Sequence, residues 1–392
     1  RARFGRSALA ALGVTMFFST LQLGCERVVL DFDDGADEGG VGGSDSIDPP
    51  PPEAPDAPEL VVDELFDTSR DEARSRNCSD GGDGVAYRVA SLRAGRAQLT
   101  TTPDADCLSV GDELLLIKLQ GNATSIENVG EFELLRVAAL EADEVEFVSA
   151  PVRRYGDAAE SDEGVERGVV VLQRVPNYSR LEVKSEAVLT ASAWDGEGGG
   201  VLALRVLGDV VVDGLVTMSR KGFRGGVTRD EVLAHGASGE SIGGVGREET
   251  SANHGGGGGG LGDQTTNGCV QDGNAGGGGG HRLAGRDASV SDLCEGMGRG
   301  RGGLGYATKG RIFLGSGGGS GGIDNVRVDN PVGGAGGAGG GIIWILGQSL
   351  TGRGRIEAEG GDGVGDEEGL ECQGFSSESC YDHSGPGGAG AG

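Results

Sequence analysis

Seven cysteines, four histidines and a large excess of carboxylates are the residues of this chain that could do chemistry. The histidines are scattered without HxxxH spacing and no CxxC occurs, so a zinc site is not predicted. We recognise no nucleophile elbow at a strand-to-helix turn and no GxxxxGK[ST] phosphate loop in the sequence. We therefore predict that the protein is not an enzyme. Paired carboxylates for glycoside hydrolysis stay an alternative, because 61 acidic residues offer many combinations.

One acidic stretch has a spacing that could hold calcium. The run from Gly360 to Asp366, GGDGVGD, approaches the calcium-binding repeat GGxGxDxUx, although its second aspartate is displaced by one position and no tandem copy follows. Asp362, Asp366 and Glu367 would supply carboxylate oxygens, which are the ligands that calcium prefers. An acidic turn is the alternative reading of this run, and no other cofactor is predicted.

Residues 1–25 have the layout of a secretory signal. Three arginines among the first six residues precede the mostly apolar run Ser7–Leu23, which is short for a membrane span. The run resembles a bacterial lipoprotein signal, in which the cysteine after the cleavage point becomes the lipid-modified first residue. Gln22 stands where that family has an aliphatic residue. The resemblance implies lipidation of Cys25, a membrane partner, and export to the outer membrane or cell surface of a bacterium. An ordinary cleaved signal and an uncleaved anchor are the alternatives.

The other six cysteines are even in number, which in an exported protein predicts disulfides. Proximity in the sequence favours three pairs, namely Cys78–Cys107, Cys269–Cys294 and Cys372–Cys380. Two of these pairs would close glycine-rich loops, where restriction of the unfolded chain stabilises the fold. Free thiols at these positions are the alternative.

The net charge of −28 argues against a nucleic-acid partner, because proteins that bind nucleic acid concentrate positive charge. Acidity of this size favours solubility. The sequence starts at Arg1 instead of methionine and stops inside a Gly/Ala run, so we expect that residues are missing at both ends.

Two segments separate the signal from the glycine-rich half. Residues 26–76 are acidic and rich in proline and glycine, a composition typical of a disordered tether. Residues 77–190 contain short apolar stretches separated by turn signals, for example Asp112–Leu119 and Val169–Val175. Strands of this length at even spacing predict a small β-barrel or β-sandwich domain.

Residues 191–392 contain most of the 81 glycines of the chain. Alanines at three-residue intervals in Gly333–Gly339 fit a polyproline-II-like glycine helix, which has three residues per turn. Without Cβ atoms such helices can pack side by side and bond through their backbones; flexible loops are the alternative. Strand-like segments next to the glycine runs repeat with offsets of 141 and 140 residues, as Gly198–Leu204 and Gly339–Ile345, and as Gly214–Ser219 and Gly354–Glu359.

Glycine helices beside strands resemble the glycine-rich domain of the anaplastic lymphoma kinase receptor family and the tip adhesins of T-even phage tail fibres. Residues 77–360, with Val169–Tyr178 and Thr190–Gly226, are more closely similar to a family of uncharacterised glycine-rich exported bacterial surface proteins. These resemblances imply an all-β fold, in which a jelly-roll-like β-sandwich with packed polyglycine-II helices forms residues 191–392 and continues beyond them. A β-helix is the alternative.

We expect a non-enzymatic structural or adhesive protein of the cell surface, whose rigid glycine-rich head contacts a cell-surface glycan or protein. Loops within Gly222–Ser251 and Leu283–Arg301 are expected to carry specificity. Trp194 and Trp344 are expected to anchor the core, with a sugar-stacking platform as the alternative. The alternative function is a carbohydrate- or calcium-dependent binding module, and a glycoside hydrolase is a further one.

Overall fold

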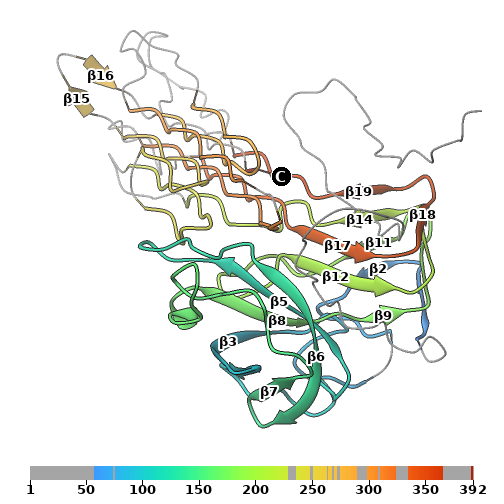
Figure 1. The fold of residues 1–392 in the computed structure, drawn as a ribbon. Helices are drawn as coiled ribbons and strands as arrows, with labels where there is room; N and C mark the ends of the chain where they lie inside the picture. Colours follow the sequence, from blue (N-terminus) through green and yellow to red (C-terminus); the bar gives the residue numbers. More distant parts are fainter. Residues whose placement is uncertain are drawn as a thin grey trace, which may run out of the picture.

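The fold is built almost entirely of β-strands and extended glycine-rich segments. The computed structural model describes residues 57–73, 76–227, 235–247, 250–262, 264–266, 269–271, 274–288, 298–307, 310–323, 334–364 and 390–391. Within these residues the helical structure is limited to the short 3-10 helix η2 (Val165–Arg167). The all-β prediction is therefore confirmed. Figure 1 shows three bodies: a barrel, a stack of short strands beside it, and a bundle of glycine-rich segments that extends away from both.

The barrel is closed and antiparallel, with the strand order β3-β4-β7-β6-β5-β8. Of the β-barrel and the β-sandwich predicted for the first folded unit, the structure therefore contains the barrel. Its strands are β3 (Ala86–Arg93), β4 (Arg96–Leu99), β5 (Glu113–Gln120), β6 (Phe132–Glu141), β7 (Glu144–Phe147) and β8 (Val169–Arg174).

Strand β5 is buried along its whole length because it has two apolar surroundings. Leu114 and Leu116 lie in the interior of the barrel. Leu115 and Ile117, which face the opposite way because strand side chains alternate, pack in a second cluster with residues of the glycine-rich half. The apolar run of this strand thus joins the barrel to the rest of the fold.

Beside the barrel, short strands form a stack of coils. A coil is one turn of chain, and each of its strands pairs in parallel with the equivalent strand of the next coil. Parallel stacking of this kind is the architecture of a β-helix. The coils contain, in order, β1 (Glu59–Val62) and β2 (Leu65–Asp67); β9 (Asn177–Tyr178), β10 (Arg180–Val183) and β11 (Val188–Thr190); β12 (Val201–Val206), β13 (Asp209–Val212) and β14 (Leu215–Thr217); and β17 (Ile342–Leu346), β18 (Ser349–Thr351) and β19 (Arg355–Glu357).

The internal repeat of the sequence corresponds to two neighbouring coils. Val201 pairs with Ile342, which is the offset of 141 residues, and Leu215 pairs with Arg355, which is the offset of 140. The predicted duplication is therefore confirmed. The barrel is inserted between β2 and β9, and the glycine-rich bundle between β14 and β17.

The parallel pairing decides between the jelly-roll and the β-helix, the two arrangements that the sequence left open for the glycine-rich half. Neighbouring coils of a β-helix pair in parallel, whereas jelly-roll strands pair antiparallel, so the stack is a β-helix. The folded part also starts earlier than predicted, because β1 and β2 lie within residues 26–76, and β9–β11 belong to the stack although they lie within residues 77–190. Strands of two to four residues whose partners are distant along the chain give little local signal.

Aliphatic ladders fill the interior of the stack. Leu181 pairs with Leu60 on one side and Val210 on the other, and all three are buried. Leu189 likewise lies between Phe66 and Val216. Each coil therefore covers the apolar face of the coil before it, and no single coil could bury its own.

The glycine-rich bundle is organised around segment 315–322. The backbone N–H groups of this segment donate in three directions that repeat every three residues, and each direction reaches a different neighbour. Residues 315, 318 and 321 bond to segment 334–340, residues 316, 319 and 322 to segment 274–280, and residues 317 and 320 to segment 237–240. Its carbonyls accept from residues 223 and 226, from residues 257 and 260, and from residue 391. A repeat of three residues is that of polyproline-II geometry, so the predicted packed polyglycine helices are confirmed.

Close backbone contact explains why these positions are glycine. A Cβ at Gly317 would lie 2.0 Å from the Arg224 carbonyl oxygen, and a Cβ at Gly319 would lie 2.0 Å from the Gly258 oxygen. Ala335 and Ala338, three residues apart, are partly exposed. A methyl group thus fits on the outer side of a segment. It does not fit between the hydrogen-bonded segments, whose packed arrangement we call the glycine lattice.

A matched pair of substitutions tests this packing. Gly317→Ala should lower the free energy of unfolding by about 1–3 kcal/mol, because the added methyl group must push two backbones apart. Gly198→Ala is the control, since a Cβ there meets only Val171 Cγ1 at 3.8 Å and should change stability by less than about 0.5 kcal/mol. Urea unfolding measures both, and equal effects of the two substitutions would contradict the lattice.

Candidate functional site

The bundle stands on the end of the barrel where β5 and β6 are connected. Gly121 N donates to the Ile242 oxygen at 2.9 Å, and Ile312 N donates to the Gly130 oxygen at 3.0 Å. The hairpin of β15 (Gln264–Thr266) and β16 (Cys269–Gln271) lies at the other end of the bundle, away from the barrel (Figure 1). The fold therefore holds one end of the bundle and projects the other.

Ionic contacts reinforce this base. Glu240 is only 3% exposed, and its carboxylate accepts hydrogen bonds from Arg224 Nε at 2.8 Å and from Gln120 Nε2 at 3.1 Å. Glu131 on the barrel side pairs with Arg311 at 2.8 Å. Because both carboxylates have cationic partners, their burial at the contact is compensated.

Aromatic and hydroxyl groups fill the space where the segments turn above the barrel. Tyr306 Oη lies 2.5 Å from Ser316 Oγ, and the Tyr306 ring packs on Phe313 at 5.3 Å between centroids. His281 Nε2 lies 3.2 Å from the Phe313 carbonyl oxygen. Burial raises the pKa of Tyr306 to about 12. The side chains of this cluster therefore contact one another and hold the bundle segments together.

A buried lysine closes the barrel below the bundle. Lys118 has no solvent exposure; its Nζ donates to the Gly156 oxygen at 2.7 Å and lies 3.7 Å from Asp157 Oδ1. Burial lowers the pKa of Lys118, and the charge of Asp157 opposes that effect. Asn128 donates to the same Gly156 oxygen at 3.2 Å. Lys118 therefore fastens the loop that follows Tyr155 over the end of the barrel.

The barrel and the coil stack are joined by a buried ion pair. Glu113 on β5 is 2% exposed, and its carboxylate accepts hydrogen bonds from Arg205 on β12, the shortest from Nε at 2.8 Å and from Nη2 at 2.6 Å. This bidentate geometry is the strong form of an arginine–carboxylate contact.

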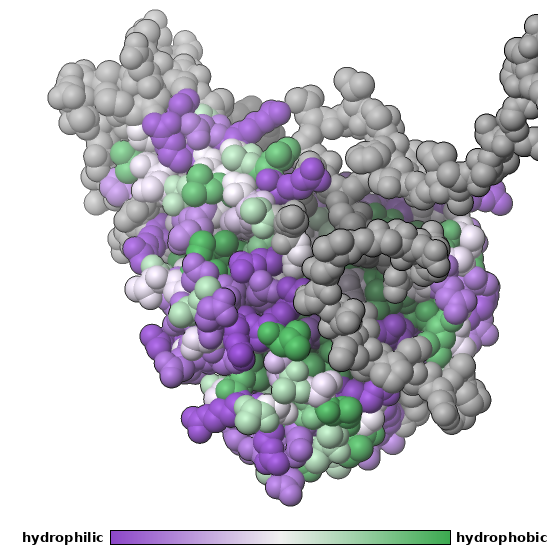
Figure 2. Space-filling view, in the orientation of Figure 1, coloured by the Kyte–Doolittle hydropathy of each residue, from purple (hydrophilic) through white to green (hydrophobic). Residues whose placement is uncertain are grey.

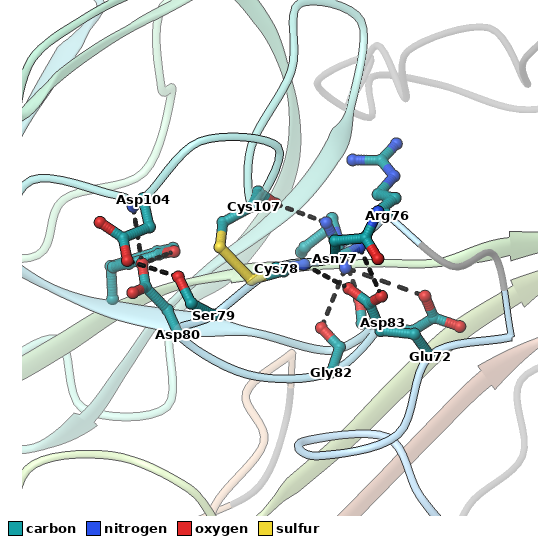
Figure 3. Close-up of a disulfide and its surroundings, with 12 residues drawn as sticks. Glu72, Arg76, Asn77, Cys78, Ser79, Asp80, Gly82, Asp83, Asp104 and Cys107 are labelled. Carbon is teal, nitrogen blue, oxygen red and sulfur yellow. Dashed lines mark hydrogen bonds and ion pairs between the residues drawn. A yellow bond between two sulfur atoms is a disulfide. The ribbon is translucent and has the colours of Figure 1, made fainter.

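A second joint lies around the disulfide shown in Figure 3. Cys78 is bonded to Cys107, which confirms this predicted pair. Arg174, 3% exposed, donates to the carbonyl oxygens of Asp83 at 2.8 Å and of Gly82 at 2.9 Å. Burial and the positive charge of Arg76 lower the pKa of Arg174. The arginine thus ties the chain before the first barrel strand to β8.

Carboxylates gather beside this joint, and most of them cap backbone N–H groups. Glu72 accepts from the amides of Asn77 at 2.8 Å and Cys78 at 3.0 Å, and Asp83 accepts from Tyr178 Oη at 2.6 Å. An open cavity of about 500 Å³ lies here, lined by residues 61–66, 70–72, 78 and 81. Two carboxylates that line it, those of Asp71 and Glu72, accept hydrogen bonds from backbone N–H groups and so hold the loops in place.

The structure describes only part of the predicted site residues. Cys25, Cys294, Cys372, Cys380, Asp366 and Glu367 lie outside the described residues, so the lipid site, two disulfides and most of the calcium candidate stay predictions. The backbone of Cys269 is in β16, and Asp362 is exposed just after a bundle segment. Within the described part of the chain, no group of three or more His, Cys, Asp or Glu side chains is placed to hold a metal ion.

Trp194 is a core residue, as expected: it is 3% exposed and packs edge-on against Phe223 at 5.4 Å between ring centroids. Trp344 is only partly buried and packs against the same apolar cluster, with its ring 6.3 Å from that of Phe132. The ranges expected to be specificity loops, Gly222–Ser251 and Leu283–Arg301, contain bundle segments that make lattice hydrogen bonds at Gly226, Gly239 and Gly285 among others. That expectation is wrong for those segments, because their glycines contact backbone instead of solvent.

The surface in Figure 2 is mixed, with hydrophilic residues spread over the visible face and hydrophobic residues in small patches between them. In the described parts of the chain, no helix has the length and apolar character needed to cross a bilayer.

The joints were not recognised from the sequence. Glu113 and Lys118 are the two charged residues inside the apolar run ELLLIKL, and this pattern was the available signal that each would need a buried partner. Nothing local indicates that the partner of Glu113 is Arg205, because the two residues come from different bodies of the fold.

Comparisons with known proteins find limited similarity. No protein-family model matches the chain, and no curated protein matches it. The Gp54 tailspike of Acinetobacter baumannii bacteriophage AP22, solved in complex with A. baumannii capsular saccharide, is 14% identical, with 42% of this chain and 31% of that chain covered and a TM-score of 0.18. The tailspike gp61 of Pseudomonas phage phi297 is also 14% identical, with 42% and 27% covered and a TM-score of 0.19. The chain spans less than a third of each tailspike, and likenesses at these TM-scores carry no argument about its function.

The buried joint between barrel and stack can be tested by mutation. Arg205→Ala should lower the free energy of unfolding by about 3–5 kcal/mol, because it leaves the Glu113 carboxylate buried without its partner. Arg96→Ala is the control, since Arg96 pairs with Glu144 on the surface with a side chain 49% exposed, and should cost at most about 1 kcal/mol. Thermal and urea unfolding measure both. Similar losses for the two variants would show that Glu113–Arg205 is not a joint.

Proposed function

We propose that the protein is a non-enzymatic structural or adhesive protein of a bacterial cell surface, and that the glycine-rich bundle is the head that it presents. The observation that supports this proposal is the packing of segment 315–322, whose backbone bonds to neighbours on all sides. A body held by backbone contacts at every third residue is stiff. At about 3.1 Å per residue, its segments extend roughly 20–30 Å from the barrel.

The polar groups of the described residues support a mechanical role. Glu113, Glu240, Lys118 and Arg174 are each buried, and each bonds to a group in another segment of the fold. Glu113 joins the barrel to the stack, and Glu240 joins the bundle to the barrel through Gln120. Lys118 and Arg174 hold loops of the barrel in place. The β15–β16 hairpin, at the end remote from these joints, is where a target would meet the head (Figure 1).

Attachment to the cell would come from the N-terminal residues. The signal-like residues 1–25 end at Cys25, and the acidic residues that follow would space the folded part from the membrane. The protein would thus be exported and lipid-anchored, with the bundle facing outward.

Adhesion by the bundle can be measured directly. The purified chain, printed against an array of bacterial and host cell-surface glycans with and without calcium, should bind through the bundle, so Gly317→Ala should weaken binding and Gly198→Ala should not. Calcium-independent contact with cells, without glycan binding, would still fit a structural role. Release of sugars that a single carboxylate substitution abolishes would replace the proposal with a hydrolase.

Lipid anchoring is a separate prediction. When the chain is expressed in a bacterium, the wild type should be found in the membrane fraction with a lipid mass on Cys25, and Cys25→Ser should move the protein to the soluble exported fraction. Cys78→Ser is the control, because it removes the disulfide but keeps the anchor. A Cys25→Ser protein that stays in the membrane would contradict lipidation.

A further inference from the structure

A short segment from far along the chain fills one position of the glycine lattice. Gly390 and Ala391 lie between three other segments, represented by Ser316, Gly340 and Gly361. Gly390 N donates to the Gly361 oxygen at 2.8 Å, and Ala391 N donates to the Ser316 oxygen at 2.8 Å. Gly340 N in turn donates to the Ala391 oxygen at 2.6 Å. The segment is therefore recognised from three sides through its backbone.

The fit of this groove selects glycine. A Cβ at Gly390 would lie 2.0 Å from the Ala338 oxygen, so no larger residue can take its place. From the groove side, a Cβ at Gly360 would lie 2.2 Å from the Gly390 oxygen and 2.8 Å from Ala391 N. Ala391 itself carries a methyl group and is partly exposed. The groove thus reads a glycine followed by a small residue, in an extended conformation.

The connection between segment and groove makes exchange between molecules feasible. Gly390 bonds to Gly361, so the connection between these two residues begins and ends at the groove. Bringing its ends together costs conformational entropy, and the same hydrogen bonds would form with a segment from another molecule. On a crowded surface the local concentration of other copies can approach the effective concentration of the tethered segment, which is on the order of millimolar.

We propose that this groove is a binding site for a glycine-rich extended segment, and that the Gly390 segment of a second copy of this chain fills it and links neighbouring heads. The inference depends on the lattice geometry and, for the crowding of copies, on the surface display proposed above, and not on any glycan partner. It would hold whether or not the protein is adhesive.

Two complementary variants of the full chain test the exchange. Gly390→Ala spoils the segment and leaves the groove open, and Gly360→Ala closes the groove and leaves the segment free. Each variant alone should be monomeric by light scattering, and their mixture should give a one-to-one complex in native mass spectrometry. Ala391→Ser is the control that should behave as wild type. Two variants with wild-type circular dichroism that form no complex on mixing would overturn the proposal.

A peptide measurement keeps the test independent of those variants. A labelled peptide of residues 385–392, GPGGAGAG, should bind the wild-type chain at raised concentration, and its Gly390→Ala form should bind at least about tenfold more weakly. If Gly390→Ala protein is folded, it should bind the wild-type peptide more tightly than the wild-type chain does, because its own segment no longer competes. Equal binding of both peptides, or binding of neither, would overturn the proposal that this groove binds a glycine-rich segment.

Discussion

Everything in the glycine-rich half depends on one constraint, which is that backbones must approach where no Cβ can fit. A single polyproline-II-like segment makes no internal hydrogen bonds, so its N–H and C=O groups have to be satisfied by neighbours. Segment 315–322 satisfies them with neighbours on every side. The bundle therefore folds cooperatively, because each segment is stable only when its neighbours are in place.

That cooperativity requires a frame, and the coil stack supplies it. The bundle leaves the stack after Met218 and returns at Gly341, and these residues are joined by a hydrogen bond from Gly341 N to the Met218 oxygen at 2.8 Å. The pairing of Val201 with Ile342 then resumes the stack as if the inserted residues were absent. Long insertions are tolerated here because their ends meet, so the cost of closing them grows only slowly with length.

The buried charges follow from the same design. The barrel, the stack and the bundle need fixed contacts with one another. The ion pair Glu113–Arg205, between barrel and stack, and the ion pair Glu131–Arg311, between barrel and bundle, set their orientation. Such pairs are costly to break, since the remaining charge stays buried without a partner. Their contribution is to position the bundle on its base.

The sequence by itself determined the all-β class and the duplicated unit. It also predicted a small barrel or sandwich, packed glycine segments as one of two options, and the Cys78–Cys107 pair, because each has a local signal in composition, period or proximity. Only the tertiary structure decided that β1 and β2 belong to the fold, that the duplicated unit is a coil of a β-helix, and that Arg205 is the partner of Glu113. Parallel pairing and buried ion pairs join residues that lie far apart in the chain, so neither leaves a pattern that one stretch of sequence can show.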